Sequence, residues 1–353
     1  MKIVIIGAGW YGLHSYITLK KLLGNTTEII ILEKTESFFE NSSNFNQNRL
    51  HLGYHYPRSS KTRNLCVSGY KRFIENYGSL IDIIDKNYYL ISNNSNIDYE
   101  TYIKIFQNEK NYDHTIMKNT DFSNIDGNII NTKEKVINSE KVKNYFISNI
   151  DMNNIKFGYN VTNIDKKDDK IILNNSIECD LCVDCTYNQL NISKKTYIYE
   201  QTISLLYDRI NFDLEFDSIT IMDGDFFSLY PRDIEKNKYT LTHVKYSPLI
   251  KSYNILDIHN YKLDETIIVN IIKKMEHDVN LYYSDFNKHF KYSSYFISYK
   301  CKLISNNDTR ECVIEECDNI INVNCGKIIG IFELEDYLQK YIYDKLNHKL
   351  NHK

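Results

Sequence analysis

The amino-terminal segment alternates between short apolar runs and segments rich in glycine or polar residues. An apolar run over residues 2–6 is followed by a glycine-rich turn, by a stretch of helical periodicity, and by a second apolar run over residues 28–32. Short apolar runs bounded by turn residues are typical of buried strands. The pattern therefore predicts a strand, a helix and a second strand, which is the βαβ unit that joins parallel strands.

The turn in this unit reads Gly7-x-Gly9-x-x-Gly12, and Glu33 directly follows the second strand. Gly7 allows a tight turn, Gly9 lets a pyrophosphate approach the backbone, and Gly12 lets the helix pack closely on the sheet. Glu33 lies 21 residues after Gly12, near the usual distance for a carboxylate that hydrogen-bonds ribose hydroxyls. A chance glycine loop is the alternative. The strand, the glycines, the helix, the second strand and Glu33 occur together at the usual spacing, which favours an adenine-dinucleotide site.

The rest of the chain contains further segments with a regular hydrophobic pattern. We expect helices over residues 61–77, from Asn138 or Ser139 to about Ile150, and over residues 333–346; strands are expected over residues 156–164, 170–173, 177–186 and 320–324. Alternating Tyr, Ile, Leu and Phe over residues 197–300 indicate a large sheet with loops. The nucleotide-binding half thus begins the chain, is interrupted, and returns near the end, whereas a contiguous NAD dehydrogenase domain completes its sheet in one piece.

Composition narrows the function classes. At 353 residues the chain is long enough for two lobes, and a net charge of −3 excludes the global basic field typical of nucleic-acid or anionic-membrane binding. No apolar run approaches the length of a membrane span. We expect no secretory signal before the first strand, and therefore a cytoplasmic protein. The oligomeric state is left open.

Three of the eight cysteines, Cys179, Cys182 and Cys185, have a spacing that resembles a metal or redox motif. Their apolar surroundings predict a strand, in which Cys179 and Cys185 face one side and Cys182 the other. Three ligands for one ion do not fit this alternation. We therefore expect buried, inert thiols, with a zinc or disulfide site as the alternative.

Several segments together resemble a known family. The segments are Gly7–Gly12 with Glu33, Asn46–Ser59, Leu181–Thr186, Asp223–Arg232, Tyr239–Val244 and Asn322–Ile329. They are similar to FAD-dependent oxidoreductases of the D-amino-acid-oxidase-like superfamily, within the glutathione-reductase-type FAD fold. Tyr187 departs from this pattern because a glycine usually follows the threonine at that position.

The resemblance implies an α/β fold with a discontinuous Rossmann-like FAD-binding domain and an inserted mixed α+β substrate domain on a large antiparallel or mixed sheet. The FAD-binding domain is expected to comprise residues 1–80, 135–195 and 311–353. The substrate domain is expected to comprise residues 81–134 and 196–310.

The same resemblance implies the site residues. Those expected to bind FAD are Gly7, Ala8, Gly9, Trp10, Tyr11, Gly12, Glu33, Lys34, Arg49, Leu50, Val161, Thr186, Gly326, Lys327 and Ile328. The catalytic candidates are His51, His55 and Lys327; the candidates for substrate binding are Tyr56, Arg58, Arg232 and His243, with Arg310 a weaker one. No metal is expected.

Each of these side chains also has a structural explanation. The loop that carries Arg49, His51 and His55 could be a solvated surface loop, and Gly326-Lys327 could simply start a helix. Arg58 fits an anionic substrate or a salt bridge to the protein body equally well, and isolated charges such as Arg232 are more often structural.

The function we expect is an FAD-dependent oxidoreductase that takes a hydride from a C–H bond next to an amine or hydroxyl of a small polar substrate. One alternative is a non-redox flavin enzyme such as a nucleotide-sugar mutase. Another is a degenerate dinucleotide-binding protein without catalysis.

Overall fold

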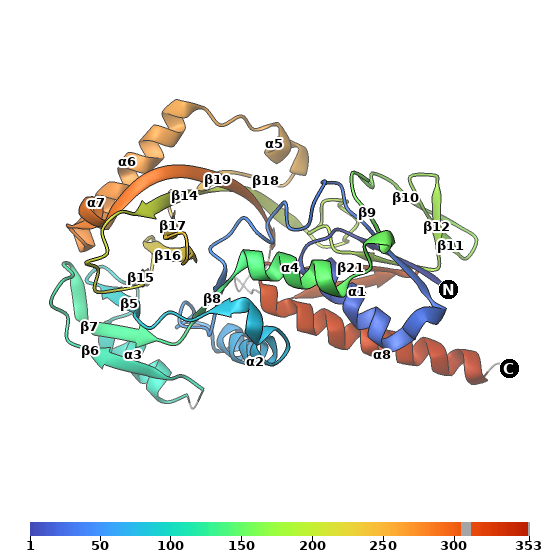
Figure 1. The fold of residues 1–353 in the computed structure, drawn as a ribbon, viewed down its shortest axis with the longest axis horizontal. Coiled ribbons are helices and arrows are strands. Elements are labelled where there is room, and N and C mark those ends of the chain that lie inside the picture. The colour runs from blue at the N-terminus through green and yellow to red at the C-terminus, as the bar shows by residue number, and fades with distance from the viewer. Residues whose placement is uncertain (110, 305–311, 352–353) are drawn as a thin grey trace. The chain divides into compact units, whose positions relative to one another are not determined.

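A computed structural model describes residues 1–109, 111–304 and 312–351, and divides the chain into two compact units (Figure 1). Unit 1 comprises Met1–Asn44, Val142–Tyr199 and Lys300–Lys353, and unit 2 comprises Phe45–Lys141 and Glu200–Tyr299. The predicted boundary after residue 80 and the observed one after Asn44 differ over residues 45–80. These residues join unit 2 because their strand pairs with a strand of that unit and Val67 packs in its core.

Unit 1 is built on a sheet with the strand order β20-β21-β13-β1-β2-β9. Its strands are β1 (Lys2–Ile6), β2 (Glu28–Leu32), β9 (Ile155–Lys156), β13 (Leu181–Asp184), β20 (Val313–Cys317) and β21 (Ile320–Asn324). All neighbours pair in parallel except β20 and β21. Ile3 to Ile6 are buried without alternation, as expected for a parallel strand covered on both faces.

The strand order of this sheet reverses beside β1. β2 lies on one side of β1 and β13 on the other, so their carboxyl ends flank the turn that follows β1. Open α/β sheets bind ligands outside the carboxyl ends of the strands at such a switch point. The fold therefore places the glycine-rich turn where a dinucleotide binds.

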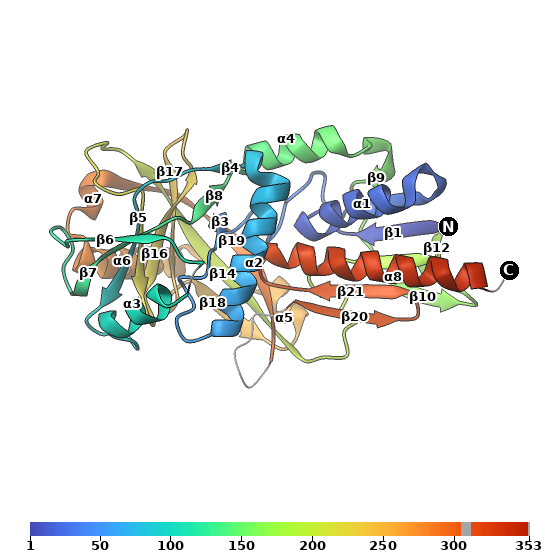
Figure 2. The same cartoon turned by 90° about the horizontal axis from the view of Figure 1, so that it is seen from below.

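Helices and a small sheet complete unit 1. They are α1 (Trp10–Leu23), α4 (Ser139–Asn149), which starts in unit 2, and α8 (Ile331–Asn351), with β10 (Ile164–Lys167), β11 (Lys170–Leu173) and β12 (Ile177–Cys179); short 3-10 turns cover Gly24–Thr26, Met152–Asn154 and Ile328–Gly330. Figures 1 and 2 both show α1 alongside α8. Asn138 caps α4 because its Oδ1 accepts hydrogen bonds from the N–H groups of Glu140 and Lys141.

Unit 2 is built mainly on a mixed sheet with the order β18-β14-β17-β16-β15-β5-β7-β6, in which β19 also pairs with β14. Its strands are β5 (Asn87–Ser92), β6 (His114–Met117), β7 (Ile125–Thr132), β14 (Tyr197–Arg209), β15 (Ser218–Met222), β16 (Phe227–Asp233), β17 (Lys238–His243), β18 (Pro248–Ser252) and β19 (Phe290–Leu303). β14 and β19 carry residues of both units. Most pairs are antiparallel, whereas β5 and β15 run parallel.

A smaller sheet and several helices complete unit 2. The sheet has the order β3-β8-β4, from Arg49–Leu50, Lys135–Ile137 and Ile81–Asp82; the helices are α2 (Ser60–Tyr77), α3 (Tyr99–Gln107), α5 (Ile255–Asn260), α6 (Glu265–Tyr282) and α7 (Phe286–His289), with a 3-10 turn at Gly78–Leu80. Ile271, Met275 and Val279 of α6 are buried in the core that also includes Leu229 and Leu241 of the mixed sheet. The predicted α/β class with a large mixed sheet is confirmed.

Two sequence-based strands are wrong in detail. The strand expected over residues 177–186 breaks at Asp180 into β12 and β13, which belong to different sheets, because the Asp180 carboxylate binds the Lys2 backbone N–H and the Lys170 side chain. Residues 157–163 lie outside strands, and Gly158 has a φ of 66°.

Burial raises the pKa of the Cys179 thiol to about 11 and raises those of Cys182 and Cys185, so these thiols stay protonated.

Among the described residues, none of the helices combines the length and the apolar character that a membrane crossing requires.

Candidate functional site

The turn after β1 brings backbone groups close together in a way that only glycine permits. Gly7 has a φ of 101°, which L side chains rarely adopt. A Cβ on Gly12 would lie 1.8 Å from the carbonyl oxygen of Gly7, and a Cβ on Gly9 would lie 2.5 Å from Ser43 Oγ. Gly12 therefore lets α1 approach the turn, whereas Gly9 leaves room for the Ser43 hydroxyl to lie against it.

Polar contacts hold the carboxylate of Glu33 against this turn. Its Oε2 accepts a hydrogen bond of 2.6 Å from the Ala8 N–H, and its Oε1 accepts one of 2.9 Å from the Thr35 N–H. The first N–H of α1, on Trp10, donates to Ser43 Oγ at 3.1 Å. The structure thus brings Ala8, Glu33 and the start of α1 together, as the sequence predicted for a dinucleotide site.

The carboxyl ends of β13 and β21 carry the other predicted residues of unit 1. Thr186 donates its N–H to the Asp184 carboxylate at 2.9 Å. Tyr187 has a φ of 62°, so it adopts the backbone conformation that a glycine would favour at this position. Its Oη would lie 3.1 Å from a Cβ on Gly326. The departure from the family pattern therefore changes the side chain but keeps a glycine-like backbone.

Lys327 is tied to the glycine turn through Tyr11. The Tyr11 hydroxyl donates to the Lys327 carbonyl oxygen at 2.6 Å, and Ile328 begins a short 3-10 turn directly afterwards. Gly330 is also required here, since a Cβ on it would lie 2.3 Å from Tyr11 Oη. The carboxy-terminal segment is thereby fixed beside the start of α1.

Asp184 is a buried acid beside this turn that the sequence-based prediction missed. It has no exposed area, and it pairs with Ile6 at the end of β1. Burial raises the pKa of its carboxyl to about 6, although the hydrogen bonds from Thr186 act in the opposite direction.

The remaining predicted residues of unit 1 are structural or exposed. Trp10 packs edge-on against Phe146 with ring centroids 5.4 Å apart, and Val161 lies in the core formed by β1, β2 and the small sheet. Lys34 is exposed.

The residues present in unit 1 fit a dinucleotide. A turn without side chains at Gly7, Gly9 and Gly12, the start of a helix, and a carboxylate at the end of the neighbouring strand match the pyrophosphate and ribose of such a molecule. Gly7 to Gly12 and Glu33 would hold it, with Thr186 and Gly326 to Ile328 at the adjacent strand ends.

Arg49 lies inside unit 2. Only 4% of its surface is exposed, and its guanidinium donates to Tyr89 Oη at 2.9 Å, Thr220 Oγ1 at 2.9 Å and Ser228 Oγ at 2.7 Å. It also stacks over the Tyr230 ring at 3.8 Å from the centroid. The neighbouring Leu50 is fully buried.

The counter-charge of Arg49 is Glu134, which lies between β7 and β8 and has no exposed area. Its Oε1 accepts the Leu52 N–H at 2.8 Å, and its Oε2 accepts the Tyr89 hydroxyl at 2.6 Å, with Arg49 Nη1 at 3.5 Å. Burial alone would raise the pKa of Glu134, but His51, Arg49 and His55 hold it well below its usual range. Glu134 is therefore a buried, ionised carboxylate.

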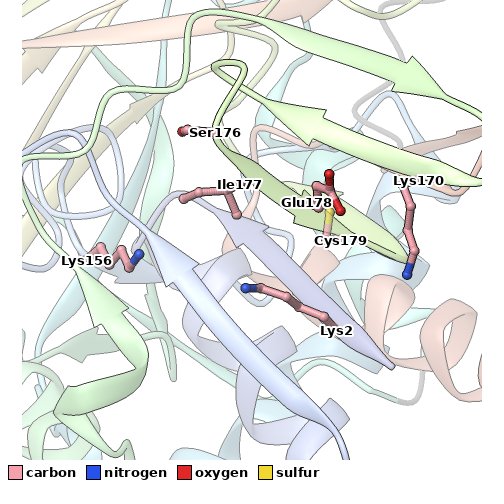
Figure 3. A pocket seen from close by; sticks show the side chains of 7 residues that line it. All are labelled: Lys2, Lys156, Lys170, Ser176, Ile177, Glu178 and Cys179. Atoms are coloured by element: carbon pink, nitrogen blue, oxygen red, sulfur yellow. The ribbon is translucent and has the colours of Figure 1, made fainter.

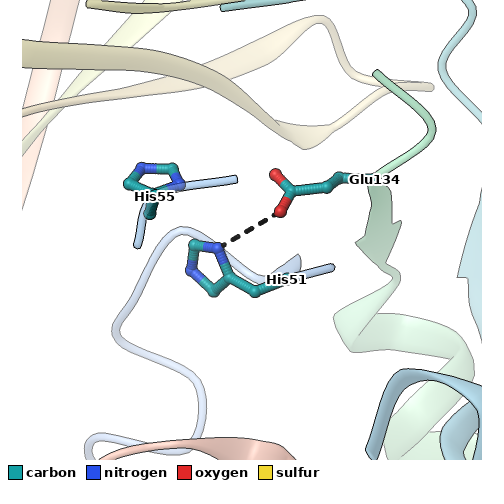
Figure 4. Close-up of side chains that lie close together, drawn as sticks. All are labelled: His51, His55 and Glu134. Atoms are coloured by element: carbon teal, nitrogen blue, oxygen red, sulfur yellow. Dashed lines mark ion pairs between the residues drawn. The ribbon is translucent and has the colours of Figure 1, made fainter. Parts of the chain in front are cut away.

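Both predicted catalytic histidines of unit 2 belong to this cluster (Figure 4). His51 Nδ1 lies 3.7 Å from Glu134 Oε1, and His55 Nδ1 is hydrogen-bonded to Tyr89 Oη at 2.5 Å. The two imidazole rings meet edge-on with centroids 4.8 Å apart. We name Arg49, His51, His55, Tyr89 and Glu134 the Glu134 cluster.

The predicted substrate-binding residues of unit 2 do not form one group. Tyr56 lies beside His51, with ring centroids 6.3 Å apart. The exposed Arg58 forms a salt bridge of 2.6 Å with Asp223.

Arg232 and His243 each have internal partners. Arg232 donates to the Asn46 carbonyl oxygen at 2.8 Å, and burial lowers the pKa of its guanidinium to about 10. His243 is buried, with Nε2 at 3.1 Å from Asp278 Oδ2 and Nδ1 accepting the Lys245 N–H. Arg310 lies outside the described residues.

A depression of about 530 Å³ in unit 1 is lined by residues of several strands (Figure 3). The lining residues are Lys2, Lys156, Lys170, Ser176, Ile177, Glu178 and Cys179. Lys2 forms an ion pair with Glu28 at the amino end of its strand, and Lys170 forms one with Asp180. None of the residues of the glycine turn lines this depression.

Sequence reasoning missed Glu134, Tyr89 and Ser43. Glu134 stands among polar residues between two strands, and Ser43 stands in an Asn- and Ser-rich loop, so neither carries a motif. Tyr89 is one of thirty tyrosines. Only the folded chain brings them beside the predicted residues.

Comparisons with known proteins agree with this geometry. No family model matches the chain. The chain is 29% identical over 346 residues to an FAD-dependent monooxygenase (FPY4) of Fusarium mangiferae, covering 97% of this chain and 91% of the relative. It is 24% identical over 379 residues to the FAD-dependent monooxygenase kojA of Aspergillus flavus, covering 98% and 86%.

Solved structures show the same fold at low sequence identity. L-α-glycerophosphate oxidase of Mycoplasma pneumoniae, solved with FAD bound, superposes with a TM-score of 0.70 at 13% identity, covering 95% of this chain and 92% of that one. Glycine oxidase of Bacillus cereus gives a TM-score of 0.66 at 14% identity, covering 99% and 95%. The fold is that of FAD-dependent oxidoreductases of the glycine-oxidase type, and the resemblance noted from the sequence is confirmed.

Proposed function

We propose that the protein is an FAD-dependent oxidoreductase that oxidises a small polar substrate at a C–H bond next to an amine or hydroxyl. FAD is held by unit 1 and the substrate by unit 2. The observation that carries the proposal is the glycine turn at the carboxyl end of β1, with the Glu33 carboxylate hydrogen-bonded to it. The whole-length similarity to FAD-dependent enzymes supports the same cofactor.

When bound, FAD accepts the hydride. In unit 1, N–H groups at the start of α1 would face the pyrophosphate, Glu33 would bind the ribose hydroxyls, and Lys327 would donate toward negative charge on the ring. The location of these residues at or after the carboxyl ends of β1, β2 and β21 supports these proposed roles.

In unit 2, His51 and His55 accept the proton that leaves the substrate hydroxyl or amine. A neutral imidazole is suited to this step because its ordinary pKa lies near neutral pH. Tyr56 lies beside His51 and contacts the substrate. The Arg58 guanidinium pairs with the Asp223 carboxylate, so an anionic substrate would compete with Asp223 for it. Arg49 donates from both Nη atoms to internal partners and acts on the histidines through Glu134.

The test is anaerobic mixing of the purified, FAD-loaded protein with a panel of amino and hydroxy acids. We expect bleaching of the flavin absorbance by at least one of them. A His51→Gln variant should bleach at least tenfold more slowly with FAD affinity unchanged. Bleaching by dithionite alone, followed by turnover of a nucleotide sugar, would instead support the mutase alternative. A colourless protein that cannot be reconstituted with FAD would support the non-catalytic one.

A second candidate function is monooxygenation, which is favoured by the two curated relatives. A monooxygenase places one oxygen atom of O₂ in the product and needs a reductant such as NADPH. An oxidase or dehydrogenase places no oxygen of O₂ in the organic product: a ketone formed from a hydroxyl keeps the substrate oxygen, and an imine formed from an amine is hydrolysed by water. Turnover under ¹⁸O₂, with NADPH consumption followed in parallel, separates the two: label in the product with matching NADPH loss supports monooxygenation, and unlabelled product without it supports hydride removal.

A further inference from the structure

The hydrogen-bond donors and acceptors of the Glu134 cluster determine which ring nitrogen of each histidine carries the proton. Tyr89 has one hydroxyl proton and donates it to Glu134 Oε2, since an ionised carboxylate can only accept. The hydrogen bond between Tyr89 Oη and His55 Nδ1 must then be donated by the histidine. His55 is therefore protonated at Nδ1, which leaves the lone pair on Nε2.

The charge of Glu134 also acts on His51. Its Nδ1 faces Glu134 Oε1 at 3.7 Å, which is longer than a hydrogen bond, and the negative carboxylate favours a proton on the nitrogen nearest to it. Hydrogen bonds of catalytic groups are often long before substrate binds and shorten afterwards. Nε2 of His51 is thus also the nitrogen with the lone pair.

The charges around Glu134 keep this arrangement fixed. Arg49 balances the carboxylate and is itself held by Thr220 and Ser228. Burial raises the pKa of the tyrosines that surround the cluster, so they stay neutral; these are Tyr54, Tyr70, Tyr89, Tyr102 and Tyr230.

We propose that Glu134 is the positioning residue of the oxidoreductase: its carboxylate fixes the Nδ1–H form of His51 directly and that of His55 through Tyr89, so that Nε2 of either ring receives the substrate proton. The inference rests on the proposed function for its catalytic meaning. Its structural content, the protonation pattern of two rings, stands independently of any substrate.

A metal ion is the competing interpretation, because candidate ligand atoms of His51, His55 and Glu134 lie within 4.8 Å of one another. Both carboxylate oxygens already accept hydrogen bonds from Leu52 and Tyr89, and the Arg49 guanidinium is 3.5 Å away. A cation would have to displace these donors and lie near a fixed positive charge. The geometry therefore favours the hydrogen-bonded cluster.

The test is ¹⁵N NMR of the full chain labelled at histidine, which reports the protonated nitrogen of each ring and its pKa. His51→Gln and His55→Gln variants assign the signals. We expect Nδ1–H rings in the wild type, whereas free histidine mostly carries its proton on Nε2. Glu134→Gln should lower the pKa of both rings by about one unit or more, which is at least a tenfold change in proton affinity.

Tyr89→Phe provides the second variant, because it keeps both buried charges and does not depend on how well Glu134→Gln folds. We expect His55 in this variant to lose its preference for the Nδ1–H form, and His51 to keep its own. Asp278→Asn is the matched control: Asp278 pairs with His243 elsewhere in unit 2, so only the His243 signal should move. The proposal is overturned if Tyr89→Phe changes both rings or neither, or if Zn²⁺ binds the wild type at micromolar concentration through these rings.

Kinetics connect the inference to function. With a substrate identified as above, Glu134→Gln should lower kcat at least tenfold and shift the acidic limb of its pH profile downward, with FAD affinity unchanged. An unshifted pH profile would contradict the positioning role. If no substrate bleaches the flavin of the wild type, the proposed function fails, whereas the NMR pattern still decides whether Glu134 positions the rings.

Discussion

The glycine turn of unit 1 and the Glu134 cluster of unit 2 are two polar sites that differ in the groups that form them. The first is made of backbone groups and tolerates no added atoms, since a single Cβ at Gly12 would lie 1.8 Å from a carbonyl oxygen. The second is made of buried charged side chains and tolerates no removal, since Arg49 and Glu134 neutralise each other without solvent. We therefore expect the glycine turn to be destabilised by added atoms and the Glu134 cluster to be destabilised by loss of a charge.

Removing one charge of the cluster should have the largest effect on stability. We expect Arg49→Leu to lower the free energy of unfolding by about 3–5 kcal/mol, because Glu134 is left as a buried charge without its partner. Urea denaturation followed by circular dichroism measures the change. The double variant Arg49→Met/Glu134→Leu is the control and should recover most of the loss; equal losses in both variants would contradict this explanation.

Adding one methyl group to the glycine turn should have the next largest effect. Gly12→Ala should cost about 3 kcal/mol, because the new Cβ meets the rigid carbonyl of Gly7 rather than a movable side chain. The same urea measurement applies. Gly78→Ala is the matched control, since Gly78 has a φ of −59° and the nearest atom to a Cβ there is 3.9 Å away. A loss at Gly12 no larger than that at Gly78 would argue against close packing of α1.

Protonation of Asp184 should make stability depend on pH. Its pKa is about 6 in the folded chain and about 4 in the unfolded chain, so the folded state binds more protons between these values. The contribution of Asp184 to wild-type stability should therefore fall by about 2 kcal/mol as the pH rises from 4 to 6. Asp184→Asn should lack this component, so its stability relative to the wild type should rise over the same interval. A pH-independent difference between the two in thermal unfolding would refute the raised pKa.

The smallest effect is expected at the depression lined by lysines in unit 1. Lys156→Ala should change FAD affinity by less than about twofold, because none of the residues of the glycine turn lines this depression. Isothermal titration with FAD measures it. A tenfold loss of FAD affinity would contradict the placement of the dinucleotide site at the glycine turn.

The same two regions explain how much the sequence could predict. The glycine turn, Glu33 and the first βαβ unit were predictable because each depends on local residue types at short spacing, and all of them lie where expected. The cluster was only half predictable. His51 and His55 stand out within one loop, but Glu134 follows them by about eighty residues with no pattern that joins them. A contact made by the tertiary fold leaves no local signal.

The assignment of residues 45–80 has the same physical cause. The loop that carries Arg49 follows the nucleotide-binding unit directly in sequence, which favoured placing it there. Its strand instead pairs with β8, and Leu52 and Tyr54 pack with Tyr89 in the core of unit 2. Long-range pairing outweighs sequence proximity at this point.

The central claim is that the turn from Gly7 to Gly12 binds FAD, and one titration tests it most directly. FAD is titrated into the purified apo forms of the wild type, Gly9→Ala, and Gly9→Ala/Ser43→Gly, with folding verified by circular dichroism. The double variant removes the hydroxyl that lies 2.5 Å from the new Cβ and so restores packing. We expect one FAD per wild-type chain and at least a hundredfold weaker binding by both variants, since the methyl group still blocks the pyrophosphate. Wild-type affinity in the folded double variant would contradict the claim.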